Sequence, residues 1–242
     1  MTIVQLTNSL AFMDKIKDII QQDGFSIVRH FFTDKYIDEI IEQLDRHHAL
    51  EYDKQIVSDF NLLNSIPFVK SLVHSRQLIS LVKQVLGDNS FPINAFVIDK
   101  TQDNNWCLDW CQDLKIAVKN KIETSGYRNW TVESGILHAV PPKEVLEKRL
   151  SVRIHLDDCF IDNGAILVAP KSHKNGIIQS KTEIEKIISG ETIYLEVEKG
   201  GVMFITSLLL HKSPYSTTNK KRRVLQIDYV GIKLSNGLEG YN

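Results

Sequence analysis

The sequence predicts a mainly β protein with flanking helices, and three observations support this class. The chain has 242 residues and 43% hydrophobic content, which is enough for one substantial core. Apolar residues at helical spacing gather in the first ninety residues. From Phe91 onward, short strand-like runs alternate with turn residues, as is typical of a barrel or sandwich. We therefore expect a single domain, with mainly helical support over residues 1–90 and a β core over residues 91–242.

Three helices are expected in the N-terminal part. The first covers residues 12–22 and ends at Gly24, before a strand-like run over residues 25–28. The second starts at a cap formed by Thr33 or Asp34 and runs to about His47, with one apolar stripe that should lie on a core. The third covers residues 75–86, and Gly87 suits the positive backbone angle that often closes a helix.

The β part contains six candidate strands, over residues 94–99, 150–156, 165–169, 192–197, 202–210 and 223–232. Tight turns are predicted at Asp162-Asn163-Gly164 and at Lys199-Gly200-Gly201. Residues 114–149 show no clear strand and one short helix after Pro141-Pro142. A stretch of this length indicates either a surface excursion or a lid over a ligand, and Tyr127, Trp130 and His138 are candidates to line such a lid.

Charge and cysteine usage exclude several classes of protein. The formal net charge is −1, so we expect neither nucleic acid nor an anionic membrane as partner. No secretion signal or membrane-spanning run is recognisable, and we expect a cytoplasmic protein. The cysteines, Cys107, Cys111 and Cys159, form no even disulfide framework. Cys107 and Cys111 are spaced like half of a structural zinc site, but no second cysteine pair completes it, and two ordinary buried thiols are the preferred interpretation.

Two groups of residues carry chemistry. His211 and Ser213 are two positions apart, so they face one side of a strand, and the apolar run before them indicates a buried approach. The basic run at residues 220–223 follows a turn that should return the chain on the neighbouring antiparallel strand, and alternation alone does not say which arginine points inward. A separate His-x-Asp string, His155-Leu156-Asp157, could form a metal site together with His211.

Three sequence blocks carry a resemblance to a known family. They are Trp110-Cys111-Gln112-Asp113, the run from Asn163-Gly164 to Lys171-Ser172-His173, and the run from Leu208 to Ser213 that is followed by Arg222. In these blocks the chain resembles the phytanoyl-CoA dioxygenase family. Members of that family read Trp-His-Gln-Asp in the first block, and Gly-Ser-His at the end of the second. The resemblance extends from about Phe96 to Tyr229.

The resemblance implies a double-stranded β-helix, a cupin-like jelly roll with a metal in its mouth. It also implies an Fe(II)- and 2-oxoglutarate-dependent oxygenase that oxidises, and most simply hydroxylates, a small molecule. Asp113 and His211 are the implied metal ligands, with Cys111 in the place of the first histidine. Arg222 and Ser213 are implied to bind the far carboxylate of 2-oxoglutarate. The proposed substrate pocket contains Trp110, Trp130, His138 and His155.

Cys111 leaves the function open. Its thiolate could bind the metal, the site could work with two protein ligands, or the pocket could have lost its metal. In the last case the protein would be a jelly-roll binding module without catalysis. A metal-dependent isomerase or epimerase, which needs neither 2-oxoglutarate nor Arg222, is a further alternative. The sequence carries no signal for the substrate or the oligomeric state.

Overall fold

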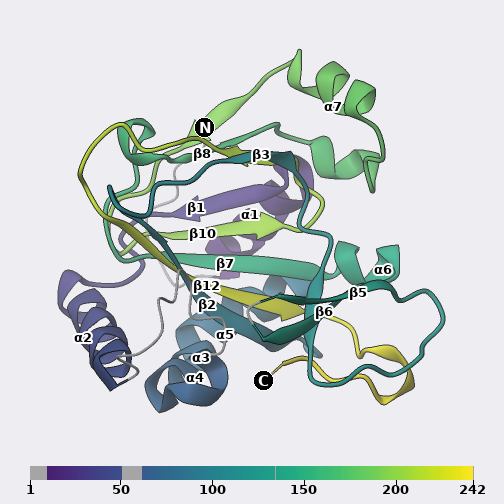
Figure 1. The fold of residues 1–242 in the computed structure, drawn as a ribbon, viewed down its shortest axis with the longest axis horizontal. Coiled ribbons are helices and arrows are strands. Elements are labelled where there is room, and N and C mark those ends of the chain that lie inside the picture. Colours follow the sequence, from purple (N-terminus) through teal and green to yellow (C-terminus); the bar gives the residue numbers. More distant parts are fainter. Residues whose placement is uncertain (1–9, 51–61, 134, 242) are drawn as a thin grey trace.

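Two antiparallel sheets dominate the computed structural model, which describes residues 10–50, 62–133 and 135–241 (Figure 1). The large sheet has the strand order β1 (Phe25–Val28), β10 (Val202–Thr206), β7 (Arg149–His155), β12 (Arg222–Val230) and β2 (Phe91–Lys100). The small sheet has the order β3 (Leu108–Cys111), β11 (His211–Ser213), β8 (Ile166–Val168) and β9 (Ile193–Leu195). This arrangement confirms the predicted mainly β class with a jelly-roll core and flanking helices.

Helices from the N-terminal part cover the outer face of the large sheet. They are α1 (Leu10–Asp23), α2 (Asp34–Leu50), α3 (Leu62–Ser65), α4 (Pro67–Val73) and α5 (Arg76–Leu86), and most of them lie below the sheet in Figure 1. Strand alternation sends Leu150, Val152 and Ile154 of β7 outward, into the largest apolar cluster together with the buried side chains of these helices. The alternate residues of β7 therefore face the space between the two sheets.

The predicted helix ends agree closely with the structure. The Thr33 side chain accepts a hydrogen bond from the Tyr36 backbone N–H at 3.3 Å, so it caps α2 as expected. Helix α5 ends at Leu86, and Gly87 follows with φ of 97°. The sequence did not predict α3, α4 or α7 (Lys181–Ile188). These helices have 4, 7 and 8 residues, which is too short for an apolar period to be recognised.

The expectation that residues 114–149 contain no clear strand is wrong. This segment forms a third antiparallel sheet of β4 (Ile116–Val118), β6 (Ile136–Val140) and β5 (Arg128–Glu133), followed by α6 (Lys143–Glu147). Its buried side chains make their own apolar cluster with Ile93 and Val230 of the large sheet. The strands were missed because β5 is largely polar and exposed, so it lacks the alternation that marks a half-buried strand.

The predicted strand over residues 202–210 is interrupted, and the interruption builds the site. Strand β10 ends at Thr206, and the chain crosses from the large to the small sheet before β11 begins at His211. Two hydrogen bonds hold the crossover: the Asp113 backbone N–H donates to the Ser207 carbonyl at 2.9 Å, and the Leu210 N–H donates to the Ser172 hydroxyl at 2.8 Å. The crossover thus places His211 on the opposite sheet from Arg222.

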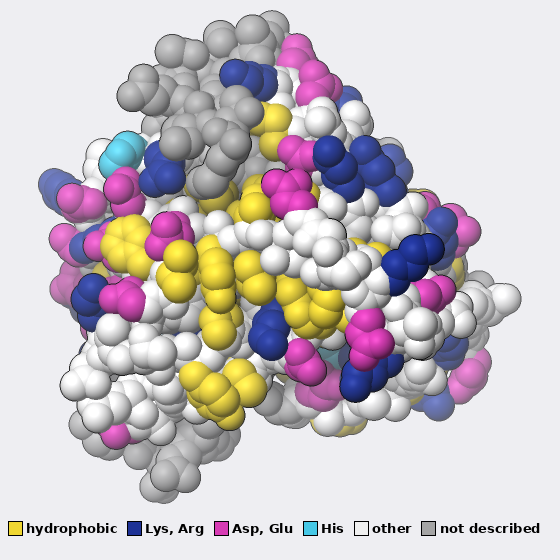
Figure 2. All heavy atoms as spheres, turned by 90° about the horizontal axis from the view of Figure 1, so that it is seen from above, with side chains coloured by type: hydrophobic (Ala, Val, Ile, Leu, Met, Phe, Trp, Pro, Cys, Tyr) yellow, Lys and Arg dark blue, Asp and Glu magenta, His cyan; other side chains and the backbone are white. Residues whose placement is uncertain are grey.

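The face of the molecule seen from above in Figure 2 carries a band of apolar side chains among charged ones. On the small sheet, Leu108 and Tyr194 are exposed large apolar residues. Within the described residues, no helix is long and apolar enough to cross a membrane.

Candidate functional site

The space between the two sheets is polar on one side, which is unusual for the interior of a sandwich. The inward residues of β7 are Arg149, Ser151, Arg153 and His155, and those of the paired strand β12 include Gln226 and Asp228. All of them are buried, with at most 7% of each residue exposed. Buried polar groups are costly unless they are paired or bind a ligand, so this interior is the candidate site.

Asp113 and His211 face each other across this interior. His211 Nε2 lies 3.8 Å from Asp113 Oδ1, and His211 Nδ1 lies 3.0 Å from the Leu209 carbonyl. That carbonyl accepts a hydrogen bond from Nδ1, so Nε2 presents a lone pair to the carboxylate. Two atoms that share one ion at about 2.1 Å each are at most about 4.2 Å apart. The pair is therefore spaced to share a cation.

Protonation states fit this arrangement. Burial lowers the pKa of His211, which leaves the ring neutral and able to bind a metal, although Asp113 acts in the opposite direction. Burial by itself raises the pKa of Asp113, but His211, Arg149 and Arg153 outweigh it, so its pKa lies below the ordinary value. Asp113 is therefore ionised at neutral pH. Its Oδ2 atom is buried and accepts no hydrogen bond.

Cys111 lies beside this pair. It is the direct antiparallel partner of His211 in the pairing of β3 with β11, so the two residues sit opposite each other. Burial, and then the charge of Asp113, raise the pKa of its thiol to about 12. Cys111 is consequently a neutral thiol in this structure, and a thiol is a much poorer metal ligand than a thiolate.

A hydrogen-bond network supports the site from the large sheet. Arg149 pairs with Asp228 at 2.8 Å and also donates to the Asp113 carbonyl at 2.9 Å. Arg153 Nε donates to Gln226 Oε1 at 2.8 Å, and Gln226 Nε2 donates to Asp228 Oδ1 at 3.0 Å. The free end of Arg153 reaches Asp113, with Nη2 at 3.7 Å from Oδ2.

Two more cations occupy the opposite end of the interior. Lys100 on β2 and Arg222 on β12 are direct cross-strand partners, and they are 0% and 3% exposed. Lys100 Nζ donates to the Ser213 hydroxyl at 3.1 Å and to the Pro214 carbonyl at 2.5 Å. Trp106 lies over both cations, with its ring centroid 4.2 Å from Lys100 Nζ and 5.7 Å from Arg222 Cζ.

Within the part of the chain that the structure describes, this pair of cations has no carboxylate counter-charge. Among the described residues, neither Lys100 nor Arg222 is ion-paired with a carboxylate, and Nε and Nη2 of Arg222 have no hydrogen-bond partner. Like charges directly opposite on neighbouring strands are destabilising. Burial, and then the charge of Arg222, lower the pKa of Lys100 to about 8. The arrangement calls for an anionic ligand.

The alternative His-x-Asp metal site is not assembled. Asp157 binds Arg223 through both carboxylate oxygens at 2.9 Å, at the end of the large sheet. Arg223 is therefore the outward arginine of the basic run, while Arg222 is the buried one. His155 does face the interior, and both of its ring nitrogens lack hydrogen-bond partners. Burial, followed by Arg222 and Arg153, lowers the pKa of His155 to about 3, so the ring is neutral.

The remaining predicted pocket residues make their contacts elsewhere. Trp130 packs against the third apolar cluster, where its ring stacks on Tyr127 with centroids 6.4 Å apart. His138 is buried on β6, and its Nδ1 lies 3.0 Å from the Ile136 carbonyl. Trp110 is half-buried on β3, and strand alternation turns it away from the face that carries Cys111. None of these contacts joins Trp110, Trp130 or His138 to the Asp113–His211 pair.

The residues fit a metal in part. Asp113 and His211 supply two suitable donors, but the described residues contain no group of three His, Cys, Asp or Glu side chains arranged to hold a metal ion. Cys111 is the neighbouring donor and would have to lose its proton. The fit to a dicarboxylate is better, because the unpaired donors of Arg222 match a carboxylate and Lys100 supplies a second positive charge.

Sequence comparison decides the family. The family model for phytanoyl-CoA dioxygenase (PhyH) matches residues 20–224. The chain belongs to this family. A comparison with curated proteins by sequence gave no match.

Solved structures agree on the fold of this family. EctD from S. alaskensis, in a structure with 2-oxoglutarate and 5-hydroxyectoine, aligns with a TM-score of 0.72 and 17% identity, over 93% of this chain and 78% of EctD. HygX from Streptomyces hygroscopicus, with nickel and 2-oxoglutarate bound, aligns with a TM-score of 0.67 and 15% identity, over 94% of this chain and 88% of HygX. SnoN is an epimerase of nogalamycin biosynthesis. Its complex with Fe³⁺, alpha-ketoglutarate and nogalamycin RO aligns with a TM-score of 0.70 and 12% identity, over 92% of this chain and 84% of SnoN.

Several site residues escaped the sequence analysis. Arg153 and Asp228 lie in runs that were recognised only as strands, whereas Lys100 follows the end of one predicted strand and Arg149 precedes the start of another. The signal for Arg153 was present, because the polar residues of β7 alternate with Leu150, Val152 and Ile154. The role of Lys100 had no comparable signal, because it depends on the pairing of β2 with β12.

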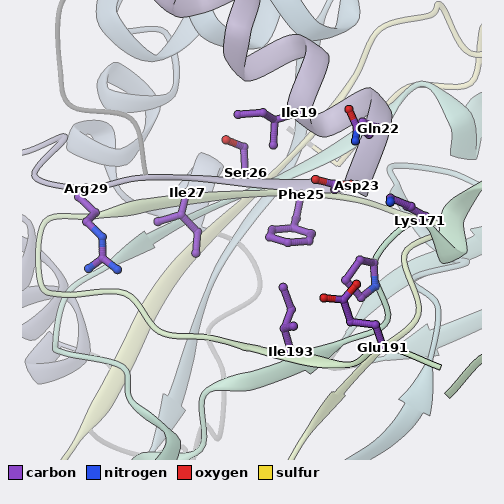
Figure 3. A pocket seen from close by; sticks show the side chains of 11 residues that line it. Ile19, Gln22, Asp23, Phe25, Ser26, Ile27, Arg29, Lys171, Glu191 and Ile193 are labelled. Atoms are coloured by element: carbon purple, nitrogen blue, oxygen red, sulfur yellow. The ribbon is translucent and has the colours of Figure 1, made fainter. Parts of the chain in front are cut away.

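A second cavity lies at a different corner of the sandwich. It has a volume of about 220 Å³ and is lined by residues of α1, β1 and β9, together with Lys171 and Glu191. Figure 3 shows Phe25 and Ile193 pointing toward one another inside it. Its lining includes none of Asp113, His211 and Arg222, so it is separate from the candidate site.

Proposed function

We propose that this protein is an Fe(II)- and 2-oxoglutarate-dependent oxygenase that oxidises a small molecule. One observation carries the proposal: a single interior holds the facing Asp113 and His211 at one end and two uncompensated cations, Lys100 and Arg222, at the other. A metal at the first end and the far carboxylate of 2-oxoglutarate at the second satisfy both sets of groups. The relatives support the choice, since HygX and EctD carry 2-oxoglutarate.

Each residue then has a defined role. Asp113 and His211 hold the metal, and Cys111 occupies the neighbouring position, where it either ligates as a thiolate or leaves room for water. The Arg222 guanidinium and Lys100 ammonium bind the far carboxylate, and the Ser213 hydroxyl, which already accepts from Lys100, can donate to it. When bound, the metal and 2-oxoglutarate together would activate dioxygen, which is the oxidant for a substrate C–H bond.

The rest of the interior positions these groups. The Gln112 side chain donates to the carbonyls of Gly176 and Leu208, at 2.8 and 2.7 Å, and so fixes the chain just before Asp113. The hydrogen bond from His211 Nδ1 to the Leu209 carbonyl fixes the ring and its tautomer. Asp113 is the more open member of the pair, with 27% of its side chain exposed against 2% for His211. Substrate therefore approaches from the Asp113 side.

The test is an anaerobic titration of Fe(II) and 2-oxoglutarate into the wild type and the C111H variant, followed by the visible charge-transfer band of the chelated 2-oxo acid. A band in both proteins supports an oxygenase site that tolerates the thiol. A band in C111H alone shows that the pocket is intact and that Cys111 prevents formation of the metal complex. Absence of the band from both refutes the proposal.

A binding module without metal is the second candidate, and one observation favours it. The position next to Asp113 is already filled by a positive charge, because Arg153 lies 3.7 Å away, and Cys111 is protonated. This reading predicts that 2-oxoglutarate binds equally well with EDTA and with Fe(II). Calorimetry under both conditions separates the two candidates, since the oxygenase requires the metal to tighten binding.

A further inference from the structure

The position of Arg153 affects how strongly a metal and a carboxylate bind together. This inference rests on the proposed function. The guanidinium of Arg153 forms an ion pair with Asp113, in which Nη2 lies 3.7 Å from Oδ2. An ion placed between Asp113 and His211 would then lie within roughly 6 Å of a second positive charge. Metal and arginine therefore compete for one carboxylate.

Arg153 cannot easily leave this position. Its Nε donates to Gln226, which is its direct cross-strand partner, and Gln226 is held in turn by Asp228. Only 9% of the Arg153 side chain is exposed. Moving the guanidinium away would break a buried hydrogen bond without an exit to solvent, which is unfavourable. The arginine stays in place when the metal arrives and loses its counter-charge.

The remaining charges of the interior do not replace that counter-charge. Asp228 is already paired with Arg149 at 2.8 Å. Lys100 and Arg222 add two further positive charges, and Arg222 is close enough to Arg153 to act against its charge. After a metal has taken Asp113, the guanidinium of Arg153 therefore needs an anion from outside the protein.

We infer that Arg153 couples metal binding to carboxylate binding. In the free protein it neutralises Asp113 and weakens the affinity for metal. When metal and a carboxylate enter together, the metal takes Asp113 and the carboxylate takes the free end of Arg153. The carboxylate is either the one of 2-oxoglutarate that lies beside the keto group or one carried by the substrate. Metal alone binds weakly, and metal and carboxylate each strengthen the binding of the other.

The experiment measures Mn(II) affinity from the signal of free Mn(II) in electron paramagnetic resonance, so it does not depend on turnover. Wild type, R153Q, R153K and R223Q are each titrated alone, with 2-oxoglutarate and with acetate. R223Q is the matched control, since Arg223 lies on the neighbouring strand but pairs with Asp157 outside the interior. Thermal unfolding of each variant checks that it is folded.

We expect R153Q to bind Mn(II) alone about tenfold more tightly than wild type, because one opposing charge is removed. The tightening by carboxylate should be about tenfold greater in wild type than in R153Q, in which only direct chelation of the metal by 2-oxoglutarate remains. R153K should resemble wild type, because it keeps the charge, and R223Q should be unchanged. A response to 2-oxoglutarate alone identifies the co-substrate as the carboxylate, and a response to acetate as well identifies a site open to substrate acids.

The inference is overturned if R153Q binds Mn(II) within twofold of wild type or more weakly, while remaining folded. That result leaves the proposed function intact, provided that D113N abolishes Mn(II) binding in the wild-type background. If Mn(II) binding is absent from wild type and from all variants, with and without carboxylate, the proposed metal site itself fails. The two failures are thus distinguishable.

Discussion

Binding of a dicarboxylate to the buried Lys100–Arg222 pair should take up protons at alkaline pH. Burial and Arg222 lower the pKa of Lys100 from 10.5 to about 8. Because the folded protein binds this proton less tightly than the unfolded chain does, Lys100 loses its positive charge as pH rises through about 8. A carboxylate placed beside Lys100 favours the charged form and restores the ordinary pKa.

The size of the effect follows from these two values. At pH 9 about one tenth of the free protein carries a charged Lys100, against nearly all of the ligand complex, so binding takes up about 0.9 proton. At pH 7 the uptake is about 0.1 proton, since the free side chain is already about nine-tenths charged. The affinity should consequently fall about tenfold between pH 7 and pH 9.

Calorimetry in two buffers with different ionisation enthalpies measures the uptake directly. 2-Oxoglutarate is titrated with EDTA present, so that metal hydrolysis does not contribute. K100M should show no uptake at pH 9, whereas K212M is the matched control and should behave as wild type, because Lys212 points away from Ser213 and lies beside the exposed Asp109. Equal proton uptake at the two pH values in wild type would refute the assignment of the carboxylate to Lys100.

Three further outcomes are expected. Replacing Arg222 by Gln should weaken 2-oxoglutarate binding about a hundredfold, because charged hydrogen bonds are lost, and leave Mn(II) affinity within about twofold; equal losses would mean that Arg222 is structural. Asp228→Asn should lower the free energy of unfolding by about 3 kcal/mol in denaturant, since Arg149 loses its buried partner, and a change below about 1 kcal/mol would contradict this. Lys171→Gly should raise the free energy of unfolding by about 1 kcal/mol, because Lys171 has φ of 67°, a backbone conformation that glycine adopts without strain. Lys174→Gly should not raise it.

Much of the site was predictable because its residues belong to local blocks. The alternation of His211 and Ser213 on a strand predicted a buried histidine and hydroxyl, and the family resemblance selected Arg222 as the buried arginine. The structure buries all three. Their roles toward metal and 2-oxoglutarate stay predictions. The expectation that Arg222 lies on the strand next to His211 is wrong, because β11 and β12 belong to different sheets. The strands between residues 114 and 149 were missed for a local reason as well, since they are short and β5 is polar.

The sequence by itself determined the mainly β class, the helical support, the family and the identity of Asp113, His211 and Arg222 as candidates. These features depend on neighbours along the chain, such as alternation, caps and turn residues. Only the tertiary structure placed Lys100 opposite Arg222, brought Arg153 to Asp113 and took Asp157 away from the interior. Strand register and the crossover after Thr206 determine these placements. Contacts between residues forty to more than a hundred positions apart depend on strand pairing, which no local pattern specifies.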